Sequence, residues 1–132
     1  MIKRSEPNVD ISEMLGKTFV SIEGMCKNSE SVLFQCDDGY RYKMYHDQEC
    51  CEHVYLEDVA GNVEDLLYSP ITLAEVVTNK DSGDKVDDCD ESWMWTYYKL
   101  ATVKGYVTLR WYGASNGYYS EEVQIDLEFD NE

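Results

Sequence analysis

Alternation between apolar and polar residues is the feature that most constrains how this chain can fold. It is clearest near the C-terminal end, where the apolar positions are Val123, Ile125, Leu127 and Phe129. The intervening positions are Glu122, Gln124, Asp126 and Glu128. Successive side chains of a β-strand point to opposite faces, so this pattern predicts a strand with one core face and one solvent face.

Seven further runs alternate or are rich in β-branched residues: KTFVSIEG, SVLFQC, YRYKMYH, EHVYLEDV, ITLAEVVTN, WMWTYYKLAT and GYVTLRWYG. The Asp37-Asp38-Gly39 step between two of them is typical of a β-hairpin. Asp10 and Asn62 can cap short helices over ISEML and NVEDLLYS, which end at Gly16 and at the Ser69-Pro70 step.

The sequence therefore predicts an α+β, β-rich fold, mainly an antiparallel sheet of about seven or eight short strands with one or two short helices. Its core is expected to contain Val107, Leu109, Trp111, Val123, Ile125 and Leu127. A chain of 132 residues is expected to form a single domain, residues 1–132. Residues 1–9 are predicted to be a loose lead-in, and the acidic residues 79–91 a mobile loop without the ligand series of an EF-hand.

The charge balance is strongly acidic, with 27 Asp and Glu against 11 Lys and Arg and a net charge of −16. Binding to duplex nucleic acid is not expected, because it requires many positive charges against the phosphates. Two interpretations of the acid remain open. It can keep the protein dispersed, or it can mimic a phosphate backbone and dock in the basic groove of a nucleic-acid enzyme.

Five cysteines are present: Cys26, Cys36, Cys50, Cys51 and Cys89. The odd count and the absence of a CxxC pair favour reduced thiols in a cytosol over a disulfide framework. The first residues lack the apolar segment of a signal peptide, and no apolar run approaches the ~18 residues of a membrane span.

The block YHDQECCEH carries four side chains that can bind zinc: His46, Cys50, Cys51 and His53. Adjacent cysteines are expected to point apart, and no second ligand pair follows, so neither a metal nor a cofactor is expected. A reactive cysteine beside His46 is an alternative for which the spacing shows no activating group. The third interpretation is a plain connection between strands with one buried cysteine.

The segment from Tyr106 to Ser120 is the candidate ligand-binding site. In the strand GYVTLRWYG, one face carries core residues, and the other carries an arginine between tyrosines, which can stack on a base and pair with a phosphate. The following turn adds hydroxyl, amide and backbone N–H groups. The candidate residues are Tyr106, Thr108, Arg110, Tyr112, Ser115, Asn116, Tyr118, Tyr119 and Ser120.

Asn-Gly is also a common hairpin turn, and Tyr–Arg pairs also stabilise ordinary sheets, so the same segment can be scaffold alone. No nucleophile elbow, phosphate-binding loop, metalloprotease motif or carboxylate pair with a clear role is present, so no catalytic residue is assigned and an enzyme is not expected.

Three segments, GKTFVSIEG, YKMYHDQECCEHVYLEDVAGNVEDLL and WTYYKLATVKGYVTLRWYGASNGYYSEEV, resemble a family of small, poorly characterised proteins encoded by phages and prophages. The resemblance runs from about Leu15 to Val123 and rests mainly on the RWYGxSNGYYSE and YHxQxCCE blocks. It implies an accessory protein of the host cell cytoplasm, of the kind that counters host defence.

Two routes are common among such proteins. One binds and withholds a nucleotide-derived immune signal without cleaving it, and the other docks an acidic surface on a host defence or nucleic-acid enzyme. Aromatic residues around Arg110 favour the first route, and the net charge favours the second. A homo-oligomer with its pocket near the subunit boundary is expected, because a chain this small seldom encloses a nucleotide alone and tyrosine-rich surfaces suit interfaces.

Overall fold

Two antiparallel sheets stacked face to face make up the fold. The computed structural model describes the backbone of residues 2–131 and the side chains of residues 5–129. One sheet has the order β1-β9-β4-β3-β2, with β1 (Ile2–Glu6), β2 (Phe19–Glu23), β3 (Ser31–Cys36), β4 (Arg41–Tyr45) and β9 (Gln124–Asn131). The other has the order β5-β8-β7-β6, with β5 (His53–Ala60), β6 (Leu73–Lys80), β7 (Ser92–Thr102) and β8 (Gly105–Ser115).

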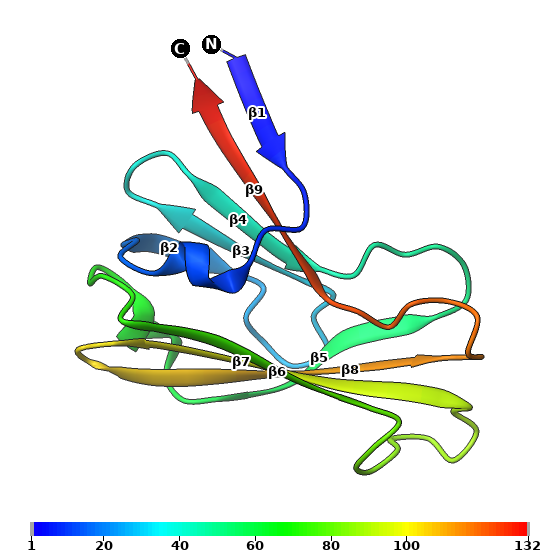
Figure 1. The fold of residues 1–132 in the computed structure, drawn as a ribbon. Helices are drawn as coiled ribbons and strands as arrows, with labels where there is room; N and C mark the ends of the chain where they lie inside the picture. Colours follow the sequence, from blue (N-terminus) through cyan, green and yellow to red (C-terminus); the bar gives the residue numbers. More distant parts are fainter. Residues whose placement is uncertain (1, 132) are drawn as a thin grey trace.

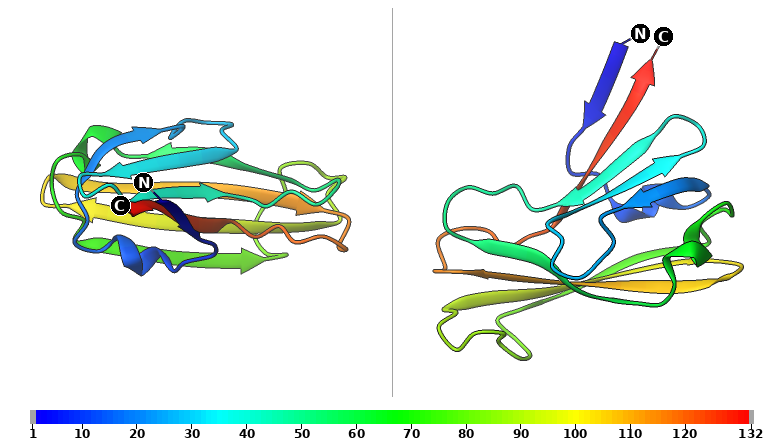
Figure 2. Two further views of the ribbon diagram at one scale, coloured as in Figure 1. Left: turned by 90° about the horizontal axis from the view of Figure 1, so that it is seen from above. Right: turned by 180° about the vertical axis from the view of Figure 1, so that it is seen from behind.

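Figure 1 shows the two sheets as separate layers, with β1 and the end of β9 extending away from the four-stranded sheet. Strands β1 and β9 lie side by side in all views (Figure 2), and they pair from Ile2 opposite Asn131 to Glu6 opposite Leu127. The expectation of a loose lead-in over residues 1–9 is therefore wrong for residues 2–6, because the edge of β9 gives them a backbone to pair with. Val9 extends this contact by donating its N–H to the Ile125 carbonyl at 2.7 Å.

The core lies between the sheets. Val107, Leu109 and Trp111 of β8 are fully buried, Ile125 and Leu127 of β9 are almost fully buried, and Val123 packs against the same cluster while partly exposed. The predicted core is thus confirmed, as is the β-rich antiparallel class. The predicted single sheet is wrong, because alternation identifies the face of each strand but not the strand beside it.

The two predicted helices are single turns of 3₁₀-helix, Ile11–Met14 and Val63–Leu66. Both predicted caps are present, since Asp10 accepts from the Ser12 N–H and Asn62 from the Glu64 N–H. The second turn ends early because the chain leaves it to pair with β2, where Leu67 bridges Phe19. Among the described residues, no helix has the length and apolar character needed to cross a bilayer.

Two neighbouring positions on β8 test this division of faces. Leu109→Ala should lower the free energy of unfolding by about 2–5 kcal/mol, because it leaves a cavity between the sheets. Thr108→Ala, one residue away on the outer face, should change it by less than about 1 kcal/mol. Urea unfolding followed by circular dichroism measures both, and equal effects would contradict the assigned faces.

Candidate functional site

The outer face of the four-stranded sheet collects aromatic side chains from three strands. Register places Tyr97 of β7 opposite Arg110, and both Trp95 of β7 and Tyr55 of β5 opposite Tyr112. The ring centroids of Trp95 and Tyr112 are 4.7 Å apart, and those of Tyr55 and Tyr112 are 6.1 Å apart. Such a face differs from the charged surface that an exposed sheet usually presents.

Arg110 stands among these rings and is already paired with acids of β5. Its Nε donates to Glu57 Oε2 at 2.7 Å, its Nη2 lies 2.5 Å from the same oxygen, and Asp58 lies 3.7 Å away. The guanidinium carbon lies 5.4 Å from the centroid of the Trp95 ring. The hydrogen bond to Glu57 outweighs partial desolvation and raises the pKa of Arg110, so the guanidinium is charged throughout the physiological range.

Residues 81–91 fold over this face and are held there by hydrogen bonds. The indole N–H of Trp95 donates to the Asp84 carbonyl at 2.8 Å, and that of Trp93 donates to the Ser82 carbonyl at 3.1 Å. The Tyr112 hydroxyl accepts from the Val86 N–H and donates to Asp90. The acidic segment expected to be a mobile loop from residue 79 therefore starts two residues later, after β6, and covers Trp95 and Tyr112.

A cavity of about 480 Å³ lies between this loop and the sheet. Arg110, Trp95 and Tyr97 line it from the sheet, and Asn79 lines it from the end of β6. The loop closes it with five residues: Ser82, Gly83, Asp84, Lys85 and Val86. Its volume lies in the range of small-molecule sites, and it places two cations beside two aromatic rings.

The structure does not bring the nine predicted site residues together. Tyr106 and Ser115 stand near opposite ends of β8, about 30 Å apart at the usual rise per residue. Tyr106 and Tyr118 are exposed, Thr108 is half-buried on the outer face, and Tyr112 is buried under the loop. Of the nine, only Arg110 lines the 480 Å³ cavity.

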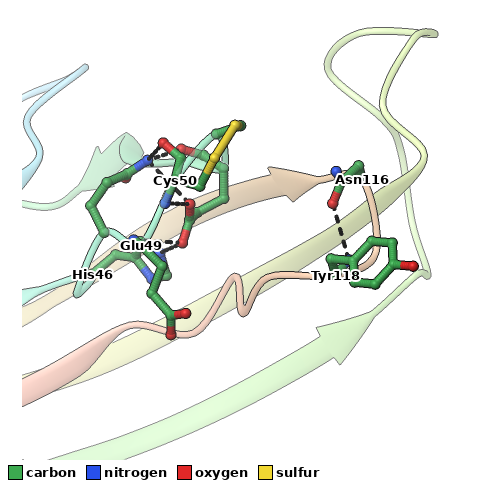
Figure 3. The surroundings of a disulfide bond; sticks show 8 residues. His46, Glu49, Cys50, Asn116 and Tyr118 are labelled. Atoms are coloured by element: carbon green, nitrogen blue, oxygen red, sulfur yellow. Dashed lines mark hydrogen bonds and ion pairs between the residues drawn. A yellow bond between two sulfur atoms is a disulfide. The ribbon is translucent and has the colours of Figure 1, made fainter.

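The polar residues of the β8–β9 connection form hydrogen bonds within that connection. The Ser115 hydroxyl donates to Glu121 at 2.6 Å and accepts from the Gly117 N–H, and Asn116 accepts from the Tyr118 N–H (Figure 3). The Ser120 hydroxyl likewise accepts from the Glu122 N–H. Tyr118, Tyr119 and Ser120 line a separate cavity of about 280 Å³, and Ser115 and Asn116 line another of about 240 Å³.

Glu121 anchors this connection from inside. Its carboxylate is buried and pairs with Lys80 at the end of β6 as well as with Ser115. The chain passes so close to β8 that a Cβ atom at Gly113 would lie 2.8 Å from the Glu121 backbone carbonyl oxygen and 3.2 Å from Val54 Cγ2. Gly113 and Glu121 therefore belong to the scaffold part of the segment.

The block YHDQECCEH is organised around a second buried acid, Glu52. Its carboxylate accepts from His46 Nε2 at 2.9 Å and from the backbone N–H groups of Glu49 and Cys50 at 3.0 and 2.8 Å (Figure 3). His46 Nδ1 lies 2.7 Å from the Glu122 carbonyl oxygen. The two contacts of the His46 ring tie the β4–β5 connection to the β8–β9 connection.

Burial alone would raise the pKa of Glu52. The hydrogen bonds from His46 and from the backbone of Cys50 and Glu49 act in the opposite direction and lower the pKa from 4.5 to about 2. His46 is thus committed to Glu52, and the other histidine, His53, packs on Tyr55 with 4.6 Å between ring centroids. Among the described residues, no three His, Cys, Asp or Glu side chains are grouped as metal ligands.

The expectation of free thiols is wrong at two of the five cysteines, because Cys50 and Cys51 form a disulfide (Figure 3). The two side chains therefore do not point apart as expected. Cys26, Cys36 and Cys89 are free. Burial raises the pKa of Cys36 to about 12, so this thiol is a core residue and not a nucleophile.

A family model described as a domain of unknown function, DUF7448, matches residues 12–125. The chain belongs to the DUF7448 family. No curated protein and no solved structure matches it. The DUF7448 match spans the strands from β2 to β8, the acidic loop and the cavity, whereas β1 and most of β9 lie outside it.

Sequence reasoning missed Trp95, Tyr97, Asn79 and Lys85 as cavity residues. The run WMWTYYK does alternate, and it would have placed Trp93, Trp95 and Tyr97 on one face. What it could not show is that this face lies beside Arg110, which depends on the pairing of β7 with β8.

Tyr112→Phe tests how the DUF7448 chain holds its acidic loop. The variant loses the hydrogen bonds to Val86 and Asp90, so the loop should open more often and trypsin should cleave after Lys85 several-fold faster. Tyr106→Phe, which alters an exposed hydroxyl on the same strand, should leave the cleavage rate unchanged. Limited proteolysis followed by mass spectrometry measures both rates, and equal rates would show that Tyr112 does not hold the loop.

Glu52→Gln tests the buried acid through its pH dependence. The lowered pKa means that the Glu52 carboxylate contributes stability that is fully present above pH 4.5 and is lost as the pH falls towards about 2. The melting temperature of Glu52→Gln should therefore lie below that of the wild type at pH 7, and the gap should narrow between pH 4.5 and 2. Glu49→Gln, in the same connection but exposed, should have the melting temperature of the wild type at every pH. If the melting temperatures of Glu52→Gln and the wild type differed by the same amount at every pH, the ionised Glu52 carboxylate would not be the source of this stability.

Proposed function

We propose that this DUF7448 protein binds and sequesters a nucleotide-derived immune signalling molecule without cleaving it. One observation carries the proposal: the cavity beneath the acidic loop places Arg110 and Lys85 beside Trp95 and Tyr97. A cation that pairs with a phosphate and a ring that stacks on a base are the two contacts that nucleotide recognition needs most. Sequestration requires no further chemistry from the protein.

The ion pair of Arg110 with Glu57 is compatible with such a ligand. Glu57 engages Nε and Nη2 of Arg110, and among the described residues no hydrogen bond to Nη1 is formed. A phosphate can therefore bind the free side of the guanidinium, or replace Glu57, whose side chain is partly exposed. Glu57 then holds the arginine in place until the ligand arrives.

The net charge of −16 opposes an anionic ligand at long range. Salt screens exposed charges beyond about 8–10 Å, so the charges lining the cavity decide short-range binding. Asp84 contributes its backbone carbonyl to Trp95, and Lys85 lies 4.8 Å from the centroid of the Trp93 ring at the same rim. The loop thus contributes a cation as well as acids.

The sequence resemblance extends the proposal to a biological setting. A phage-encoded accessory protein that withholds a nucleotide signal in the host cytoplasm would blunt a defence response that depends on that signal. The family match names no function, so this setting rests on the resemblance of the RWYGxSNGYYSE and YHxQxCCE blocks.

An acidic inhibitor of a host enzyme is the second candidate. The observation that favours it is the anchored loop, which presents, besides Asp81, four exposed acids in a defined arrangement: Asp84, Asp87, Asp88 and Glu91. Neutralising these four to Asn or Gln should abolish protection of a phage from a defended host if the loop docks on an enzyme, whereas Arg110→Ala should leave protection intact. If the protein sequesters a nucleotide instead, Arg110→Ala should abolish protection.

Arg110→Ala should weaken nucleotide binding by about 2–4 kcal/mol, because the phosphate loses its charged partner in a partly dry site. Glu57→Gln should strengthen binding, because it frees the guanidinium. Isothermal titration with cyclic dinucleotides, cyclic trinucleotides and cyclic ADP-ribose isomers measures the affinities. Chromatography of the ligand released by heating should recover it intact, and a cleaved product would show an enzyme.

Arg41→Ala is the matched control for this experiment. Arg41 is 38% exposed against 40% for Arg110, and it also pairs with a glutamate, Glu128, at 2.6 Å, but on the other sheet. Both variants lose an exposed ion pair, which costs less than about 1 kcal/mol of stability. Only Arg110→Ala should bind the nucleotide more weakly than the wild type. Equal binding by the two variants would exclude the cavity as the site.

A further inference from the structure

Each sheet of this sandwich has two edge strands, and an unprotected edge can pair with another chain. The edges are β1 and β2 in one sheet and β5 and β6 in the other. Proteins usually block such edges with a bulge, a covering segment or charged residues. Three of these edges carry such a device.

Strand β5 is blocked by a bulge and by a covering loop. Its register with β8 shifts between Leu56 and Asp58. On its free side, the Leu56 carbonyl accepts from the Asn28 N–H and the Leu56 N–H donates to the Ser29 carbonyl, both at 2.7 Å. Both backbone groups of Leu56, at the middle of this edge, are therefore already bonded.

Strands β2 and β1 are blocked in other ways. Strand β2 has a register shift between Phe19 and Ser21, and the Tyr68 N–H donates to the Phe19 carbonyl on its free side. Strand β1 has five residues, carries Lys3 and Arg4 in its sequence, and is followed at once by Pro7. Short length, basic residues and proline all discourage further pairing.

Strand β6 has no bulge. Its two charged residues, Glu75 and Lys80, flank an uncharged run, and the 3₁₀ turn Ile11–Met14 packs against the strand. Its eight residues pair with β7 without a register shift, and among the described residues no segment pairs with its other side. Residues 76–79, Val-Val-Thr-Asn, carry no charge in a chain with a net charge of −16. Val76 and Val77 point to opposite faces and are 42% and 53% exposed. This is the composition of a strand with a partner on both sides.

We propose that β6 pairs antiparallel with β6 of a second copy of this chain, joining two four-stranded sheets into one. A twofold axis that passes through Val77 perpendicular to the sheet keeps the outer faces of both copies on the same side of the joined sheet. Val77 then faces Val77 of the second copy, Val76 faces Thr78, and Glu75 faces Asn79. The register sets β-branched residues against one another and places no two like charges in direct opposition.

The self-complementary register is the argument for a second copy, and the position of the cavity is compatible with it. Asn79, at the edge of β6, belongs to the lining of the 480 Å³ cavity on the outer face. In the dimer, the two cavities would lie on one continuous face on either side of the axis. On the inner side, a groove of about 220 Å³ would continue into its counterpart; it is lined by Val76, Thr78, Met94, Thr96, Tyr98, Glu122 and Val123.

Sedimentation equilibrium of the full chain, from about 1 to 500 µM, should give a species of twice the 15.3 kDa chain mass. Val77→Lys should raise the dissociation constant roughly tenfold or more, because two ammonium groups would face each other at the axis. Val103→Lys, at a valine that is 84% exposed in the β7–β8 turn, should leave the dissociation constant unchanged. Melting temperatures of the two variants should remain close to that of the wild type.

Hydrogen exchange locates the interface independently of any substitution. Backbone amides of residues 75–80 that do not bond to β7 should exchange more slowly as the protein concentration rises, whereas β1, β2 and β5 should show no such change. A wild-type monomer throughout the concentration range would overturn the proposal and leave the edge to another protein. So would an oligomer that Val77→Lys leaves intact, or one without concentration-dependent protection in β6. None of these readouts depends on the nucleotide.

Discussion

The packing of Trp111 between the sheets is the contact on which the rest of the structure depends. Its side chain is fully buried, and its indole N–H donates to the Met44 sulfur of the facing sheet at 3.2 Å. Because neighbouring side chains of a strand point to opposite faces, burying Trp111 sends Arg110 and Tyr112 to the outer face. The core and the candidate site are thus two consequences of the orientation of β8.

An aromatic outer face has to be covered, and the acidic loop does this with its backbone. Trp95 and Tyr112 bury their rings while their polar atoms bond to the loop, as buried Trp and Tyr usually require. Asp81 and Asp90 also accept hydrogen bonds from Trp93 and Tyr112, and the other acidic side chains of the loop can stay in water. This explains how a segment with six acids and no hydrophobic periodicity can still close a cavity.

The sequence predicted the faces of the strands well, because alternation reports burial directly. It identified Arg110 as an outward-facing arginine among aromatic residues, which the structure confirms. It could not show that Ser115, Asn116 and Ser120 accept from nearby backbone N–H groups, because a short polar side chain in a turn has the same pattern whether it binds a ligand or caps its own backbone. It also treated the acids as surface charge, and so missed the buried Glu52 and Glu121. Glu52 pairs with His46 of its own connection, and Glu121 pairs with Lys80 at the end of the distant strand β6.

The distribution of charge connects these observations. Glu52 is buried against His46 and Glu121 against Lys80, so the remaining acids are the ones that act on the surroundings of the protein. A surface with a large negative charge repels other copies, which protects a β-rich chain from indiscriminate pairing. That protection is weakest where charge is absent, along residues 76–79 of β6. The proposed pairing of β6 with a second copy uses this uncharged run, so the repulsion between the acidic surfaces acts least at the point where the two copies would meet.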